Sequence, residues 1–184
     1  MLYPYEYVNS VFEIDYEKLY ALGYRGVIFD IDNTLVHHGE DSTPEVDELF
    51  RHIHDTGLKT LLLSNNDTQR IERFLRNIDS LYIPDAEKPK VDNYYKAINM
   101  LGLNKNEVVF VGDQLFTDIY GANKCGIANI LVKFLQYQTE TKIGTRRMLE
   151  KYILGFYKRN KSCQHRIGDI HKERECIKNV VETR

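Results

Sequence analysis

Five short apolar runs divide this chain into segments that alternate with helical patterns. The runs cover residues 27–29, 60–63, 81–83, 108–111 and 130–132. Almost every position in them is apolar, which is typical of strands buried on both faces. Between the runs, apolar residues recur at helical spacing, for example over residues 46–53. Strands that alternate with helices predict βαβ units, a parallel five-stranded sheet and a doubly wound, three-layer α/β sandwich.

Capping residues mark the ends of the predicted helices. Thr43-Pro44 predicts an N-cap followed by proline at the first helical position, and Gly57 can end that helix. Further helices are predicted over residues 71–78, 91–102 and 116–124. The N-terminal arm is rich in aromatic and β-branched residues, and a short helix is expected after Asp15. We expect this arm to pack against the sheet or a C-terminal helix.

The composition is that of a soluble globular protein of ordinary domain size. The chain has 184 residues, of which 42% are hydrophobic and 28% charged. No apolar run is long enough to span a membrane, and the N-terminus lacks the regions of a signal peptide. Three scattered cysteines do not form a disulfide framework. These features predict a cytoplasmic protein.

Charge is distributed unevenly along the chain. Residues 1–138 carry 13 Lys and Arg against 21 Asp and Glu, whereas residues 139–184 carry 12 against 6. Within the basic part, residues 142–161 combine basic side chains with an apolar stripe. Such a helix can dock on the domain or lie at an anionic membrane, and the sequence alone leaves both open. We expect a domain over residues 1–160 that includes this helix, and a mobile polar tail over residues 161–184.

Polar residues that could act in catalysis or binding follow four of the predicted strands. They are Asp30, Asp32, Asn33 and Thr34 after the first, Ser64 and Asn65 after the second, Lys88 after the third, and Asp113 and Asp118 after the fourth. Each has a plain explanation alone, as a turn, a helix cap or a solvated charge. Because ligands bind at the carboxyl ends of parallel strands, their joint occurrence there predicts an active site.

Phosphoryl transfer needs these residue types together. Asp30 would be the nucleophile, and Asp32 would protonate the leaving alcohol and later deprotonate a water molecule. Backbone N–H groups of the turn at Asn33 and Thr34, with the Ser64 hydroxyl, would hold the phosphoryl oxygens. Mg²⁺ and a lysine would neutralise the phosphate charge, with Asp113 completing the metal site. Asp118 would hold a metal-bound water or orient Lys88.

The pattern Asp30-Ile-Asp32-Asn-Thr34, Ser64-Asn65, Lys88-Pro89 and Gly112-Asp113…Asp118 resembles the four motifs of the haloacid dehalogenase (HAD) superfamily of phosphatases. The resemblance implies an aspartyl-phosphate on Asp30. It also implies Mg²⁺ held by the Asp30 and Asp113 carboxylates and the Asp32 backbone carbonyl, with Ser64, Asn65 and Lys88 at the phosphate. The segments Glu6-Tyr-Val-Asn-Ser-Val-Phe12, Leu63-Ser-Asn-Asn66, Lys88-Pro89 and Gly112-Asp-Gln-Leu-Phe-Thr-Asp118 resemble the YqeG-type, subclass IIIA branch. That branch is similar to the mitochondrial phosphatidylglycerophosphate phosphatases of fungi. Choosing Lys88 over Lys90 rests on the Lys-Pro pair.

Two comparisons narrow this interpretation. A receiver domain uses similar residues, but its phosphorylated aspartate lies on a later strand than its acidic pair, whereas Asp30 and Asp32 follow the same strand. The spacing from Thr34 to Ser64 and from Asn66 to Lys88 leaves no room for a cap domain. We therefore expect a capless enzyme with an open site. His37 and His38 lie on a short flap near it, where exposed loop histidines are the plainer interpretation.

The expected function is thus a Mg²⁺-dependent phosphomonoester hydrolase. Its expected substrate is a phosphorylated small molecule or a lipid headgroup, and the family resemblance favours phosphatidylglycerophosphate. The alternatives are a soluble phosphatase for a sugar phosphate or nucleotide, and a non-catalytic binding or scaffold protein. Peripheral membrane contact through residues 142–161 would accompany the lipid substrate, and no nucleic-acid partner is expected.

Overall fold

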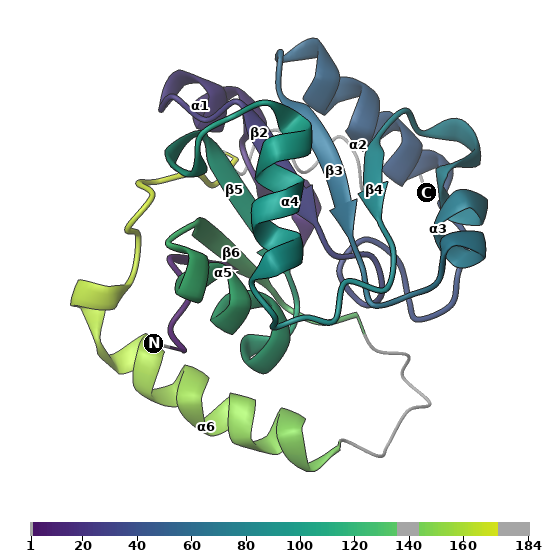
Figure 1. Cartoon of the computed structure of the whole chain (residues 1–184). Helices are drawn as coiled ribbons and strands as arrows, with labels where there is room; N and C mark the ends of the chain where they lie inside the picture. The colour runs from purple at the N-terminus through teal and green to yellow at the C-terminus, as the bar shows by residue number, and fades with distance from the viewer. Residues whose placement is uncertain (1, 136–143, 173–184) are drawn as a thin grey trace.

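The computed structural model of this protein describes residues 2–135 and 144–172. A six-stranded sheet with the order β1-β6-β5-β2-β3-β4 lies at its centre (Figure 1). Every neighbouring pair is parallel. The strands are β1 (Glu6–Val8), β2 (Gly26–Phe29), β3 (Lys59–Leu63), β4 (Leu81–Ile83), β5 (Val108–Gly112) and β6 (Ala128–Val132). The five predicted strands and the parallel arrangement are confirmed.

The sixth strand, β1, corrects the predicted strand number. It pairs with β6 at the edge of the sheet, with Glu6 opposite Ile130 and Val8 opposite Val132. Its burial alternates, because Tyr7 is only half-buried between two buried neighbours. A three-residue alternating edge strand lacks the continuous apolar run that marks the central strands, so its sequence identified only an arm that packs on the sheet.

Helices cover both faces of the sheet. They are α1 (Tyr16–Ala21), α2 (Pro44–Asp55), α3 (Thr68–Phe74), α4 (Asp92–Leu101), α5 (Tyr120–Cys125) and α6 (Thr145–Arg159). Helices α4 and α5 lie in front of the sheet, as Figure 1 shows, while α1, α2 and α3 pack on its other face. Val27 and Phe29 of β2 point into the core beneath α1 and α2, and Ile28 into the core beneath α4. The predicted three-layer sandwich is confirmed.

Local sequence signals set the helix ends as predicted. The Asp15 side chain caps α1 by accepting a hydrogen bond from the Lys18 N–H. Thr43 caps α2 in the same way, with Pro44 at its first position. Gly102 ends α4 with a φ of 66°, a left-handed conformation that glycine adopts at little cost.

Strand register brings the predicted functional residues to one edge of the sheet. Phe29, the last residue of β2, lies opposite Leu62 of β3 and Val111 of β5. The three strands therefore end nearly level, and the residues that follow them emerge side by side. Between β2 and β3 there are only the loop over residues 30–43 and α2, and between β3 and Lys88 only α3, a short 3₁₀ turn and β4. The site is therefore capless and open, as expected.

The chain after α6 returns to the domain. Ile167 and Ile170 are buried in the same core as β2 and α2, and the Ile167 N–H donates to the buried Glu6 carboxylate over 3.1 Å. His171 forms an isolated bridge with Ile14. Residues 161–172, which were expected to belong to a mobile tail, thus pack on the domain, and residues 173–184 lie outside the described part of the chain. None of the described helices is long and apolar enough to cross a membrane.

We expect the Ile170→Ala variant to lose about 2–5 kcal/mol of unfolding free energy, because it leaves a cavity at a fully buried position. Urea denaturation at pH 7.5 measures this loss. Leu149→Ala is the control, since Leu149 is 56% exposed and its truncation should change the unfolding free energy by less than about 0.5 kcal/mol. Equal effects of the two substitutions would show that the chain after α6 does not contribute to the core.

Candidate active site

A buried lysine joins two carboxylates at the centre of the site. The Lys88 ammonium donates to Asp30 over 2.6 Å and lies 2.8 Å from Asp118. The Lys88 side chain is 3% exposed, Asp30 8% and Asp118 0%. Lys90, by contrast, is 64% exposed and pairs with Glu87 at the surface. Of the two candidate lysines, Lys88 is therefore the one at the site.

Hydrogen bonds between two loops hold Lys88 in this position. The Asn65 side chain accepts a hydrogen bond from the Lys88 N–H over 2.8 Å. The Ala86 N–H donates to the Ser64 carbonyl, and the Asp85 N–H to the Asn66 carbonyl, both over 2.9 Å. The loop after β3 thus fixes the position of the loop after β4 through these hydrogen bonds.

A glycine allows Asp118 to pack against the end of β5. A Cβ atom on Gly112 would lie 2.7 Å from the Asp118 side chain, closer than side-chain atoms can approach. Asp118 lies in a π-helical turn, Leu115–Ile119, that precedes α5, and its carboxylate accepts a hydrogen bond from the Gln114 N–H over 3.0 Å. Gly112 is therefore needed for close packing and not for an unusual φ.

Three carboxylates form an acidic cluster that could hold a cation. Oxygens of Asp30, Asp113 and Asp118 lie within 4.8 Å of one another. The Thr34 hydroxyl lies 3.3 Å from Asp30 Oδ2 and 3.5 Å from Asp113 Oδ1, and its single proton cannot satisfy both. Because Asp118 is occupied by Lys88 and Gln114, the facing oxygens of Asp30 and Asp113 are the ones left for a metal. Hard oxygen donors of this kind suit Mg²⁺.

Charge balance in the cluster also favours a bound cation. The Arg147 guanidinium forms an ion pair with Asp113, so two cations, Lys88 and Arg147, face three carboxylates. Burial raises the pKa of Asp30 to about 6, with Lys88 opposing this effect. Burial lowers the pKa of Lys88, but Asp118 and Asp30 outweigh burial and raise it. The lysine therefore stays charged. Glu150 also pairs with Arg147, so the carboxylates outnumber the cations, and burial together with Asp118 and Asp30 raises the pKa of Asp113.

Asp32 has a separate set of partners. It accepts hydrogen bonds from Asn66 over 2.8 Å, Arg70 over 3.0 Å and the Gly39 N–H over 3.1 Å, and His38 lies 3.2 Å away. Burial raises the pKa of Asp32, but these donors and charges outweigh burial and lower it. Asp32 is therefore ionised at neutral pH in this structure, and it is not part of the acidic cluster.

A polar cavity of about 170 Å³ opens beside Asp30. It is lined by Asp30, Asp32, Asn33, His38, Ser64, Asn65, Asn66, Lys88, Gln114 and Thr117. Of the predicted phosphate-binding residues, Thr34 is not part of this lining, because it is buried and its hydroxyl faces Asp30 and Asp113. The other predicted residues of this group line the cavity. His38 also lines it, whereas the sequence favoured a plain loop role.

Sequence reasoning missed Asn66, Arg70 and Arg147 as residues of this site. Asn66 donates to both Asp32 and the Ser64 hydroxyl, and it directly follows the predicted Ser64-Asn65 pair. Arg70 and Arg147 reach the site from α3 and α6, helices whose arginines resemble ordinary surface charges. Only the extension of the Ser64-Asn65 motif by one residue could have found any of them.

Comparison with known proteins agrees with this geometry. A model of the haloacid dehalogenase-like hydrolase family matches residues 37–126. The chain is 34% identical over 157 residues to the "Probable phosphatase YqeG" of Bacillus subtilis, a match that covers 85% of this chain and 91% of that protein. The chain belongs to the haloacid dehalogenase-like hydrolase family. This HAD hydrolase is therefore an enzyme, and the prediction of a HAD-type phosphatase is confirmed at the level of the family.

Solved structures share the fold of this HAD hydrolase. A protein from Listeria monocytogenes serotype 4b aligns with a TM-score of 0.51 and 20% identity, over 74% of this chain and 99% of that one. The "Putative haloacid dehalogenase-like hydrolase" from Bacteroides fragilis aligns with a TM-score of 0.52 and 17% identity, over 64% of this chain and 91% of that one. At such identities the likeness concerns the fold alone.

We expect the Lys88→Met variant to lose about 3–5 kcal/mol of unfolding free energy, because it leaves two buried carboxylates without their shared cation. Urea denaturation at pH 7.5 with a chelator present measures this loss. Lys90→Met is the matched control, since its exposed ion pair contributes at most about 1 kcal/mol. A loss for Lys88→Met no larger than that of the control would contradict the buried ion pairs.

Proposed function

We propose that this HAD hydrolase is a Mg²⁺-dependent phosphomonoester hydrolase that acts through an aspartyl-phosphate on Asp30. The observation that carries the proposal is the buried Lys88 ammonium, 2.6 Å from Asp30 at the wall of a polar cavity. An anionic carboxylate can attack an anionic phosphate only where positive charge is already in place. Lys88 supplies that charge next to the nucleophile.

The metal would be held by the Asp30 and Asp113 carboxylates and the Asp32 backbone carbonyl. When bound, Mg²⁺ neutralises charge on the phosphoryl group during transfer. Asp118 is held by Lys88 and the Gln114 N–H, so its proposed role is to orient Lys88. Asn33, Ser64 and Asn65 line the cavity and would contact the phosphoryl oxygens, and Thr34 would act from behind by orienting the two carboxylates.

The reaction proceeds in two steps, transfer of the phosphoryl group to Asp30 and its hydrolysis. An Asp30 oxygen bonds to phosphorus as the bond to the leaving oxygen breaks, and Asp32 gives that oxygen a proton. Asp32, now a carboxylate, then takes a proton from water, whose oxygen attacks phosphorus and releases phosphate from Asp30. Arg70 and His38 oppose the protonation of Asp32, whereas a bound anionic substrate favours it by adding negative charge.

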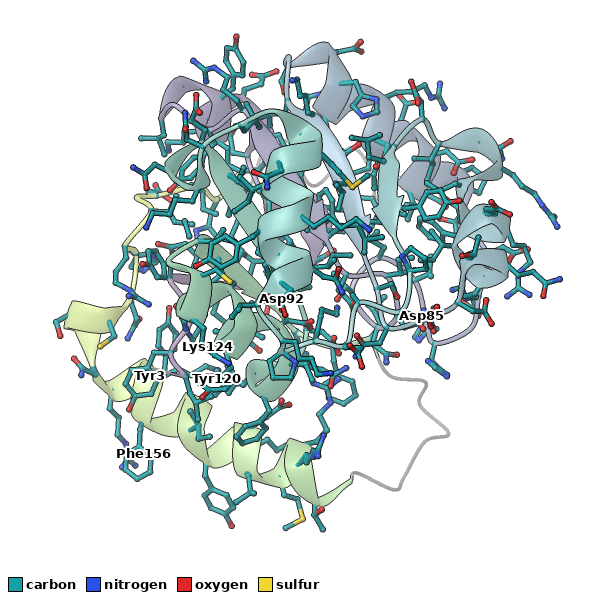
Figure 2. All side chains as sticks on the ribbon, in the orientation of Figure 1. Tyr3, Asp85, Asp92, Tyr120, Lys124 and Phe156 are labelled. Atoms are coloured by element: carbon teal, nitrogen blue, oxygen red, sulfur yellow. The ribbon has the colours of Figure 1, made fainter. Side chains whose placement is uncertain are left out.

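Replacing Asp30 tests this mechanism directly. With Mg²⁺ present, we expect Asp30→Asn to lower phosphate release from a panel of phosphomonoesters by at least about 10³-fold, because the amide cannot act as the nucleophile. The matched control is Asp85→Asn, because Asp85 is an exposed residue of the loop after β4 (Figure 2) and asparagine tolerates its positive φ. Chelation of Mg²⁺ should abolish the wild-type activity. Activity that survives Asp30→Asn would refute the aspartyl-phosphate.

For the substrate we propose phosphatidylglycerophosphate, which would yield phosphatidylglycerol. The family resemblance supports a lipid phosphate, and the cavity supports a substrate whose body stays outside. A volume of about 170 Å³ is small compared with ordinary ligand pockets, which hold a whole molecule. Such a cavity suits the phosphate-bearing end of a larger compound.

The outer face of α6 supports contact with an anionic membrane. Met148, Leu149, Tyr152 and Phe156 are each at least half exposed, and Figure 2 shows the Phe156 side chain pointing away from the sheet. Exposed basic residues border this apolar ridge, namely Arg146, Lys151, Lys158 and Arg159. Buried apolar side chains plus charge attraction are what hold an interfacial helix at an anionic surface. Helix α6 also docks on the domain, through Leu154 and Tyr157 among others, so both uses predicted for it are compatible.

A soluble substrate is the second candidate. The cavity is lined by polar side chains, including Asn33, Gln114 and Thr117, and these would suit the hydroxyl groups of a sugar phosphate or nucleotide. A scaffold protein without turnover is disfavoured, because every predicted catalytic side chain is present.

We expect phosphatidylglycerophosphate in detergent micelles to be hydrolysed at least about 10-fold faster, by kcat/KM, than sugar phosphates and nucleotides. The reason is that α6 would concentrate the enzyme at the interface. Co-sedimentation with phosphatidylglycerol vesicles, compared with phosphatidylcholine vesicles, measures the membrane contact. Leu149→Ser/Tyr152→Ser/Phe156→Ser should abolish this co-sedimentation and leave hydrolysis of small esters unchanged. Equal values of kcat/KM for micellar and soluble substrates would contradict the proposal that the substrate is a phospholipid.

A further inference from the structure

Arg147 of α6 binds both the carboxylate and the backbone carbonyl of Asp113, an arrangement that we call the Arg147 clasp. The Arg147 guanidinium donates to the Asp113 carbonyl over 2.8 Å through Nη1 and to Asp113 Oδ2 through Nη2. The Asp113 side chain is 0% exposed and Arg147 is 19% exposed. A planar guanidinium that donates to both groups fixes the side chain relative to its own backbone.

A second residue of α6 holds the arginine in turn. Glu150 accepts a hydrogen bond from Arg147 Nη1 over 2.9 Å and another from the Leu115 N–H over 2.9 Å. Glu150 is 6% exposed, an unusual burial for a glutamate on a helix that lies at the surface. The Arg147 guanidinium also lies 4.7 Å from the centre of the Phe134 ring. The arginine is thus held from three sides.

This clasp determines which oxygen of Asp113 faces the nucleophile. Because Oδ2 is taken by Arg147, Oδ1 is turned toward the Thr34 hydroxyl that also contacts Asp30. A divalent cation between Asp30 and Asp113 would need this orientation. Groups that orient a metal ligand in this way typically change metal affinity when they are removed.

We infer that Arg147, held by Glu150, is a positioning residue that turns the Asp113 carboxylate toward the divalent cation of the active site. The inference rests on the proposed metal site. It makes α6 a structural part of the active site, in addition to any contact that its outer face makes.

Two effects of Arg147 on the cation oppose each other. Its positive charge repels a divalent ion, so its removal would strengthen binding if charge alone mattered. Its hydrogen bonds hold the carboxylate in place, and their loss leaves a buried carboxylate without its partner and free to rotate. Removing an orienting partner typically weakens metal binding by about 10- to 100-fold. We expect this second effect to win, because Asp113 is fully buried and its clasp uses both ends of the guanidinium.

Calorimetric titration of the full-length protein with Mg²⁺ at pH 7.5 tests the inference. We expect Arg147→Met to raise the dissociation constant for Mg²⁺ by about 10- to 100-fold. Arg146→Met is the matched control, with the same substitution at an exposed neighbouring position, and should stay within about 2-fold of wild type. Arg147→Lys should fall between the two, because an ammonium can neutralise Asp113 but cannot donate to both of its groups in one plane.

A dissociation constant for Arg147→Met within about 2-fold of wild type, or a lower one, would overturn the inference. If that variant does not fold, Arg147→Lys and Glu150→Gln carry the test, with expected increases of at least about 3-fold. Glu150→Gln keeps an acceptor for the Leu115 N–H and removes only the charge that holds Arg147. Phosphate release tests the proposed function separately: weaker Mg²⁺ binding in a protein without phosphatase activity would refute the function and support the inference.

Discussion

The buried ammonium of Lys88 is the group around which the rest of the site is arranged. A charged lysine in a protein interior is costly unless carboxylates surround it, and here Asp30 and Asp118 do so from two different strand ends. This requires β2 and β5 to end level and the loop after β4 to reach across β3. The same ion pairs raise the pKa of the lysine and keep positive charge beside Asp30.

Each carboxylate at the site obtains a distinct role from its neighbours. Asp118 is occupied by Lys88 and a backbone N–H, Asp113 is held by Arg147, and Asp32 is held by Asn66 and Arg70. Asp30 and Asp32 both line the cavity, and of these two only Asp30 pairs with the lysine. Four chemically identical aspartates therefore differ in their partners and in their access to the cavity.

Helix α6 connects the site to the surface of the molecule. Its inner face carries Arg147 and Glu150 into the acidic cluster, while its outer face carries an apolar ridge with basic borders. The chain that follows it returns to the domain through Ile167 and Ile170. Any contact made by the outer face would therefore involve a helix that is held on the domain and is hydrogen-bonded to Asp113 through Arg147.

The sequence by itself determined five of the six strands, the caps of α1, α2 and α4, and the residue types at the strand ends. These follow from local rules: buried parallel strands are continuously apolar, caps have fixed chemistry, and the carboxyl ends of parallel strands share one edge. Asp30 and Ser64 could be placed at that edge for this reason, and Lys88 by its pairing with Pro89. The edge strand β1, the clasp of Arg147 on Asp113, the hold of Arg70 on Asp32 and the return of residues 161–172 were decided only by the tertiary structure. Each depends on contacts between residues far apart in the chain, and no local pattern records which distant side chains will meet.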